Sequence, residues 1–123
     1  AEAEAYLGTT VAGFPNLFLM VGPNTGLGHN SIIYMIESQI SLIMDTLRQM
    51  KKRNARFVSV RPEVQRQYNE ALQARLKKTV WASGCQSWYL GPSGKNPTLW
   101  PGFTFEFRNK TRRLKGDDYQ WVA

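Results

Sequence analysis

Apolar residues between positions 32 and 50 recur at steps of three and four, which is the spacing of one face of an α-helix. The recurring residues are Ile32, Ile36, Ile40, Ile43, Leu47 and Met50. This pattern predicts a helix over residues 31–52, followed by Asn54 as a left-handed cap. Ile33, Leu42 and Met44 widen the stripe, so the predicted helix is apolar on more than one side and needs a covering element.

A continuous apolar run, residues 17–21, precedes this helix and is bounded by Pro15-Asn16 and Gly22-Pro23. Such a run predicts a short strand buried on both faces, as in parallel sheets. Residues 22–30 then form a glycine-rich loop, and Asn30 or Ser31 can cap the helix. A strand, a glycine loop and a helix start together offer free amides to an anion or a polarised ring. The alternative is a purely structural role, since many such units bind nothing.

The rest of the chain predicts smaller elements. Phe57–Val60 alternates as a short strand, and Pro62 opens an amphipathic helix that ends at Lys77 and Lys78. Its apolar face is formed by Val64, Tyr68, Ala71, Leu72 and Leu76, and its polar face by Arg66, Gln67, Asn69, Gln73 and Arg75. Strands are expected at 86–90 and 103–107, a turn at 91–94, and a short extended piece at 6–11. The tail, residues 108–123, receives no assignment.

Composition limits the possible classes of protein. The 123 residues are 42% hydrophobic, enough for one domain or a piece of a larger one, and no segment predicts a membrane span or a signal peptide. A single cysteine excludes an internal disulfide and a cysteine-based metal cluster, and a single histidine leaves little for zinc. No metal site is therefore expected. A reducing, cytoplasmic location is the simplest inference.

The net charge of +7 is concentrated in residues 48–61, 75–78 and 108–115. Such surfaces can attract nucleic acid, anionic lipid or a phosphate-bearing cofactor. The alternative is a set of solvated faces, some of them helix ends where cations suit the dipole. We favour that alternative and expect nucleic-acid binding to be weak, lost at moderate salt and without sequence preference, because no zinc finger, helix-turn-helix or RNA-binding aromatic motif is present.

No residue is predicted to be catalytic. His29, in the glycine loop, has the hydrogen-bonding or packing role that a lone histidine usually has. Cys85 lies between Gly84 and Gln86 near two tryptophans, which favours an inert packed thiol over a nucleophile. Glu37 is a solitary helical carboxylate, and the aromatic residues around Trp88 and Trp100 favour a small packed cluster over a ligand platform.

Two blocks of sequence resemble the C-terminal part of flavin-dependent monooxygenases of the Baeyer–Villiger and flavin-containing types. The first runs from Gly13 to Ser31, GFPNLFLMVGPNTGLGHNS, and continues to Ile36-Glu37-Ser38-Gln39. The second comprises Thr79-Val80-Trp81, Gly84–Tyr89, Gly94-Lys95-Asn96 and Leu99–Gly102. Together they cover nearly the whole chain.

The resemblance implies an α/β fragment: the strand, glycine loop and long helix that end an FAD-binding domain (1–56), then a C-terminal extension with an amphipathic helix and an aromatic-rich β region (57–123). It implies cofactor contacts at Gly22, Asn30, Ser31 and Ile32, with the helix start aimed at the pyrimidine end of the flavin. It also implies ring or substrate contacts at Leu27, Gly28 and His29. A helix N-terminus suits that position because reduced flavin is negative near N1 and O2.

The resemblance further implies that the parent enzyme uses FAD, NADPH and O2 to oxygenate an organic substrate such as a ketone. The family's two dinucleotide-binding glycine fingerprints and its upstream histidine-containing signature are absent from these residues. The chain alone is therefore expected to hold no FAD tightly and to be inactive. Its expected partners are the remainder of the flavin enzyme or, in isolation, a second copy. Two alternatives stay open: a basic interaction module binding nucleic acid or an acidic partner, and one subunit of a split oxygenase.

Overall fold

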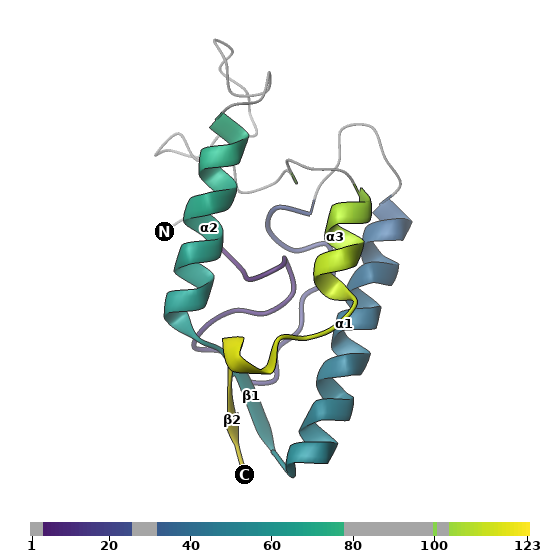
Figure 1. Cartoon of the computed structure of the whole chain (residues 1–123), viewed down its shortest axis with the longest axis vertical. Coiled ribbons are helices and arrows are strands. Elements are labelled where there is room, and N and C mark those ends of the chain that lie inside the picture. The colour runs from purple at the N-terminus through teal and green to yellow at the C-terminus, as the bar shows by residue number, and fades with distance from the viewer. Residues whose placement is uncertain (1–3, 26–31, 78–99, 101–103) are drawn as a thin grey trace.

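The computed structural model describes residues 4–25, 32–77, 100 and 104–123 (Figure 1). The elements are α1 (Ile32–Arg53), β1 (Phe57–Val60), α2 (Pro62–Lys77), α3 (Thr104–Thr111), the 3-10 turn η1 (Gly116–Asp118) and β2 (Tyr119–Val122). The strand expected at 86–90 and the turn at 91–94 lie outside the described residues. The described part is thus a small α/β structure in which α1 and α3 lie side by side and α2 lies across from them.

The long helix is confirmed, with bounds one residue later than predicted. Three basic residues occupy the last turn of α1, and Asn54 ends it with φ 55°. The Ala55 amide then donates to the Met50 carbonyl at 2.9 Å, which closes the helix end. The helix is indeed apolar on two sides. Its buried face contains Met35, Ser38, Gln39, Leu42 and Thr46, whereas large apolar side chains on another face are exposed: Ile33, Ile40, Met44 and Leu47.

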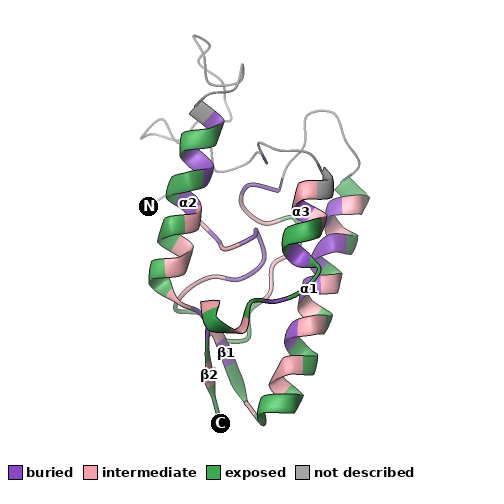
Figure 2. Cartoon of the chain, in the orientation of Figure 1, coloured by how far each residue is buried: buried purple, intermediate pink, exposed green. Residues whose placement is uncertain are grey.

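The amphipathic helix is confirmed as α2, and Pro62 is its first residue. Leu72 and Leu76 are buried, and the outward face is exposed (Figure 2). The prediction was wrong for two polar residues, because Asn69 and Gln73 are buried. Asn69 Nδ2 donates to Glu4 Oε1 at 2.9 Å, so the N-terminal segment covers this part of α2 and supplies the hydrogen bond that burial requires.

Residues 17–21 form no strand, which corrects the prediction. Leu17, Met20 and Val21 are each more than 40% exposed, and Val21 has a left-handed φ of 53°. The Leu19 amide donates to the Thr9 carbonyl at 2.7 Å, but no strand of the described residues pairs with this run. An apolar run becomes a buried strand only where neighbouring strands satisfy its backbone, and the described sheet consists of β1 and β2 alone.

Residues 103–107 were also wrongly predicted to be a strand, because α3 begins at Thr104. Two tertiary contacts fix the helix. Glu106 accepts two hydrogen bonds from Arg75, at 2.7 and 2.9 Å, and the fully buried Phe107 packs edge-on against Trp100 with ring centroids 5.2 Å apart. The Thr111 hydroxyl bonds the Phe107 carbonyl one turn back, at 2.9 Å. A five-residue alternation is too short to outweigh such contacts.

The strand Phe57–Val60 is confirmed as β1, and the unassigned tail supplies its antiparallel partner β2, with Phe57 opposite Val122 and Val60 opposite Tyr119. On the other edge of β1 lies Asn16, at φ 61°. Its amide donates to the Val58 carbonyl at 3.0 Å, its Oδ1 accepts from the Val58 amide at 2.9 Å, and its Nδ2 donates to the Arg56 carbonyl at 2.9 Å. Asn16 therefore joins the N-terminal segment to the sheet.

The N-terminal segment winds between α2 and α1 (Figure 1). Residues 6–11 are not extended as expected: Tyr6 and Thr10 close a tight turn in which Leu7 and Gly8 have φ 52° and 60°. One hydrophobic core joins this turn to every layer. Its buried members are Leu7, Met35, Leu42, Val58, Val60, Leu72, Leu76, Trp100, Phe107, Leu114 and Tyr119.

Candidate functional site

The entrance to the glycine loop and the first turn of α1 form the candidate site, of which Gly22 and Ile32 are described. Leu27, Gly28, His29, Asn30 and Ser31 lie outside the described residues, so their predicted contacts stay predictions. Ile32 begins α1 and is 39% exposed. The first turn of α1 contains no acidic residue. The first amides of a helix have no partner within it, so this end carries positive potential that no acidic residue of its own first turn offsets.

Close packing explains why a glycine stands at position 22. A Cβ at Gly22 would meet the carbonyl oxygen of Gly8, and a Cβ at Gly8 would meet Cγ2 of Thr25. Thr25 is completely buried, and its hydroxyl donates to the Gly22 carbonyl at 2.7 Å. The start of the loop is therefore locked onto the turn at Gly8. This accounts for glycine at position 22 without a ligand, and the predicted cofactor contact there stays a prediction.

Gln39 holds the segment that enters this loop, a role that was not predicted for it. It is completely buried on α1. Its Nε2 lies 2.8 Å from the Gly8 carbonyl, 3.0 Å from the Thr9 hydroxyl and 3.2 Å from the Leu19 carbonyl. Its Oε1 accepts from the Val21 amide at 2.8 Å. One side chain thus holds both the turn at Gly8 and the segment that enters the glycine loop. The available signal was an amide on the buried face of the helix, where a polar group must find partners.

A second polar group is formed by three tyrosines, of which Tyr119 is buried and Tyr6 and Tyr68 are half-buried. The Tyr6 ring packs edge-on against Tyr68 and Tyr119, with centroids 5.2 and 5.9 Å away, and its hydroxyl donates to Asp118 Oδ2 at 2.6 Å. Burial raises the pKa of all three phenols, and the bond to Asp118 raises the pKa of Tyr6 further. They stay protonated near neutral pH, so we assign this cluster to the core.

Other chemistry is limited in the part of the chain that the structure describes. These residues contain no group of three or more His, Cys, Asp or Glu side chains placed to hold a metal ion. Cys85 and Trp88 lie outside them. Trp100 and Phe107 belong to the main core, so the expected separate aromatic cluster is not found for this pair. None of the described helices has the length and hydropathy of a membrane span.

The chain is similar in sequence to known monooxygenases. No protein-family model matches the chain. It is 58% identical over 118 residues to a Baeyer-Villiger monooxygenase of Pseudomonas aeruginosa, covering 94% of this chain and 22% of that protein. It is 38% identical over 121 residues to the FAD-binding monooxygenase ktnD of Aspergillus niger, covering 94% of this chain and 20% of that protein.

The fold agrees with these relatives. The crystal structure of cyclohexanone monooxygenase from Rhodococcus sp. Phi1 bound to NADP+ superposes with a TM-score of 0.79 at 27% identity, covering 98% of this chain and 24% of that one. The chain spans about a fifth of the length of the curated relatives that it matches. Over nearly all its length, it is therefore similar in sequence and fold to the C-terminal part of Baeyer–Villiger flavin monooxygenases, as the sequence indicated.

Proposed function

We propose that this chain is the C-terminal segment of a flavoprotein monooxygenase that uses FAD, NADPH and O2 to oxygenate an organic substrate such as a ketone. The observation that supports this most directly is the 58% identity to a Baeyer-Villiger monooxygenase over 118 residues. A relative named as FAD-binding and a similar structure bound to NADP+ support the two cofactors. We retain the proposed division into 1–56 and 57–123, and a cytoplasmic location, as parts of this proposal.

In the whole enzyme, we assign the start of α1 to the flavin. Bound flavin would supply the redox chemistry, and Asn30, Ser31 and Ile32 would hold the pyrimidine end of its ring. The first turn of α1 fits this role because it contains no carboxylate that would oppose a negative ring. Gly22 would lie at the base of the loop, with Leu27, Gly28 and His29 facing ring or substrate. Gln39 would act as a positioning residue, because it fixes the segment that leads into the loop.

The test uses the whole coding sequence. We expect the reading frame upstream of these residues to encode a G-x-G-x-x-G fingerprint, and the purified whole protein to contain flavin and to oxidise NADPH when a ketone is added. The 123-residue chain, prepared in parallel, is the control and should show neither property. An upstream sequence without any dinucleotide fingerprint, on this or a neighbouring gene, would refute the proposal. A fingerprint on a separate gene would instead favour the split oxygenase.

We also propose that the apolar face of α1 is where the remainder of the enzyme, or a second copy of the isolated chain, packs. Ile33, Ile40, Met44 and Leu47 are 62%, 48%, 48% and 46% exposed and follow one another at helical spacing. Contiguous apolar surface of this kind is uncommon on soluble monomers. Sedimentation velocity at micromolar concentration should therefore show self-association, most simply a two-fold dimer.

The matched variants separate this face from exposed apolar residues in general. Ile40→Lys with Met44→Lys should convert the chain to a monomer, because both charges would be buried at the contact. Phe14→Lys alters a residue that is 59% exposed in a different part of the surface and should leave association unchanged. A wild-type chain that stays monomeric would contradict the proposal.

A further inference from the structure

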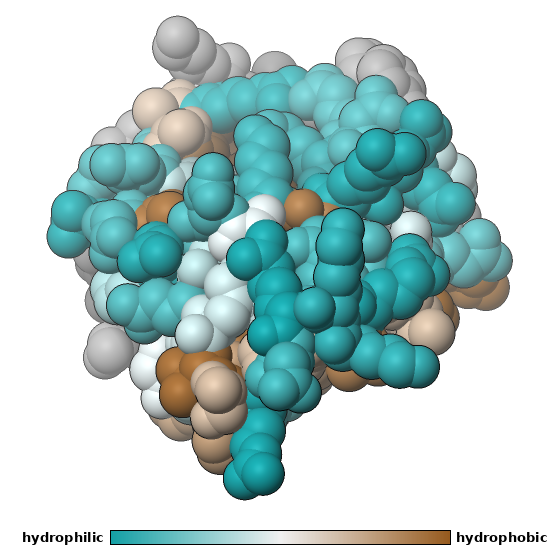
Figure 3. All heavy atoms as spheres, turned by 60° about the horizontal axis from the view of Figure 1, so that its bottom comes forward, coloured by the Kyte–Doolittle hydropathy of each residue, from teal (hydrophilic) through white to brown (hydrophobic). Residues whose placement is uncertain are grey.

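A hollow of about 780 Å³ lies between the last three turns of α1 and the loop that follows α3. It is separate from the flavin end of α1, because about 1.5 Å of rise per residue puts Arg48 roughly 24 Å from Ile32. Its lining residues are mostly cationic: Asp45, Arg48, Gln49, Lys52, Arg53, Arg112, Arg113 and Leu114. The end of the molecule that contains the last turn of α1 is largely hydrophilic (Figure 3). The composition of the hollow indicates a polar ligand.

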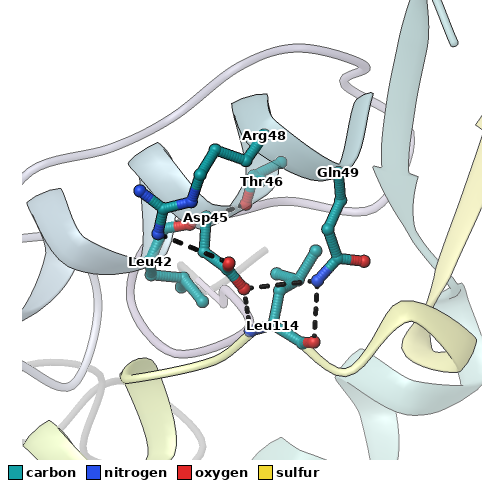
Figure 4. Close-up of polar contacts among 6 residues, drawn as sticks. All are labelled: Leu42, Asp45, Thr46, Arg48, Gln49 and Leu114. Carbon is teal, nitrogen blue, oxygen red and sulfur yellow. Dashed lines mark hydrogen bonds and ion pairs between the residues drawn. The ribbon is translucent and has the colours of Figure 1, made fainter. Parts of the chain in front are cut away.

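The hollow has a fixed wall. Asp45 Oδ2 accepts from the Leu114 amide at 2.7 Å and from Gln49 Nε2 at 3.2 Å, and Gln49 Nε2 also donates to the Leu114 carbonyl at 3.1 Å (Figure 4). These contacts hold the loop against α1, and buried Leu114 closes the space beneath. Arg112 and Arg113, which precede Leu114, are thereby kept beside the basic end of α1.

Asp45 is the only carboxylate among the described residues that line the hollow, and most of its hydrogen-bonding capacity is taken by the contacts of that wall. The Asp45 side chain is 17% exposed, its Oδ2 is occupied by the loop, and its Oδ1 lies 3.5 Å from Arg48 Nη2. It can compensate one cation at most, whereas five basic side chains line the hollow. The carbonyl end of α1 adds only about half a negative charge. A net positive potential therefore remains.

Arg53 is pre-organised in this arrangement. Its guanidinium carbon lies 4.6 Å from the centroid of the Trp121 ring, and its Nη2 lies 3.4 Å from Gln49 Oε1. A Cβ at Gly116 would meet Arg53 Nη2, so glycine at this position leaves room for the guanidinium. Lys52, Arg112 and Arg113 are exposed, as Arg53 is, but among the described residues they have no ion pair with a carboxylate. One arginine is held in place while three further cations are available to a ligand.

We propose that this hollow binds a small polyphosphate, an anion that contains two or three linked phosphate groups. Arginine forks match phosphate oxygens in geometry as well as charge, and several of them face one space here. The volume lies within the range of about 300–1,000 Å³ that is usual for small-molecule sites. Among the described residues, no aromatic ring lines the hollow, and these residues offer nothing on which a nucleobase could stack. A compact inorganic chain fits these features better than a nucleic acid.

The experiment titrates the 123-residue chain with tripolyphosphate by isothermal calorimetry, at constant ionic strength, with orthophosphate in a parallel series. We expect saturable binding of one tripolyphosphate per chain, at least tenfold tighter than orthophosphate. Arg112→Gln with Arg113→Gln should weaken tripolyphosphate binding at least tenfold without changing the thermal unfolding temperature of the free protein, because both side chains are exposed. The control, Arg56→Gln with Arg66→Gln, removes the same charge at exposed positions outside the hollow and should change binding less than twofold.

Three results would overturn the proposal. Binding of tripolyphosphate no tighter than that of orthophosphate would leave only general ion screening. Equal weakening by the two double variants would assign the binding to net charge and not to the hollow. Tighter binding of a short DNA duplex than of tripolyphosphate, with the same dependence on Arg112 and Arg113, would make the surface a nucleic-acid site.

Discussion

Replacing Gln39 by leucine should be the most damaging single substitution among the polar residues on the buried face of α1. The leucine has a similar volume but cannot form any of the four contacts that the amide makes. The buried Gly8 carbonyl would lose the hydrogen bond that it accepts from Gln39. The buried Thr9 hydroxyl would also lose the hydrogen bond that it accepts from Gln39, but it would still donate to the Leu7 carbonyl at 2.8 Å. The Leu19 carbonyl and the Val21 amide are partly buried, so water can replace some of what they lose.

The magnitude follows from these four groups. A buried polar group left without its partner costs about 1–3 kcal/mol, and one that water can reach costs less. Two buried and two partly buried losses, set against the apolar gain of the leucine, give a net destabilisation of about 3–5 kcal/mol. A chain of 123 residues is expected to have about 6–18 kcal/mol of stability in total. The variant should therefore lose a large fraction of it.

Urea unfolding, followed by circular dichroism and tryptophan fluorescence, measures this loss. Gln67→Leu is the matched control, because Gln67 is an exposed glutamine on α2 and the same exchange there should change stability by less than about 0.5 kcal/mol. If Gln39→Leu costs less than about 1 kcal/mol while the control behaves as expected, Gln39 does not anchor the loop entrance.

Three further predictions concern the tyrosine cluster and the cofactor. Among the described residues, the buried Tyr68 hydroxyl has no hydrogen-bond partner, so Tyr68→Phe should change the free energy of unfolding by less than about 0.5 kcal/mol. Tyr6→Phe removes the hydrogen bond to Asp118 and should lower the free energy of unfolding by about 1.5–3 kcal/mol in the same urea assay. Burial raises the folded-state pKa of Tyr6, Tyr68 and Tyr119 above the pKa of about 10 that a tyrosine has in the unfolded chain. The stability that these groups contribute is therefore complete below about pH 10 and declines as the pH rises further. A urea midpoint that is no lower at about pH 11 than at about pH 9 would contradict this. The isolated chain should bind no FAD tightly, and a purified preparation with stoichiometric flavin absorbance would show that prediction to be wrong.

Periodic patterns in the sequence identified those elements whose own residues contain the signal, even where their packing partners lie far away in the chain. The stripe from Ile32 to Met50 predicted α1 to within a residue at each end, and Pro62 predicted the start of α2, because caps and proline act locally. The alternation at Phe57–Val60 predicted β1. Its partner β2 was missed because a four-residue strand in a polar tail has too weak a signal without knowledge of what it pairs with.

The errors arose where distant residues decide the structure. Residues 17–21 have the composition of a buried strand, but Val21 bonds to the Gln39 side chain and no described strand lies beside the run. Phe107 alternates with Phe105 as in a strand, yet its packing on Trp100 and the pairing of Glu106 with Arg75 favour a helix. For the candidate site, the sequence indicated the glycine loop and the helix start. The role of Gln39 could not be predicted, because its four hydrogen-bonding partners come together only in the folded chain.

Asn16 determines how the small sheet can take part in assembly. An unpaired strand edge is a template for another chain, and proteins commonly block such edges to avoid aggregation. Here β2 pairs with one edge of β1. At the other edge, the Asn16 amide donates to the Val58 carbonyl and the Asn16 side chain accepts from the Val58 amide. At that edge, the middle of β1 has no free backbone group for an incoming strand. Addition of a strand to β1 would first require release of the N-terminal segment, whereas a contact through the apolar face of α1 requires no rearrangement of the backbone.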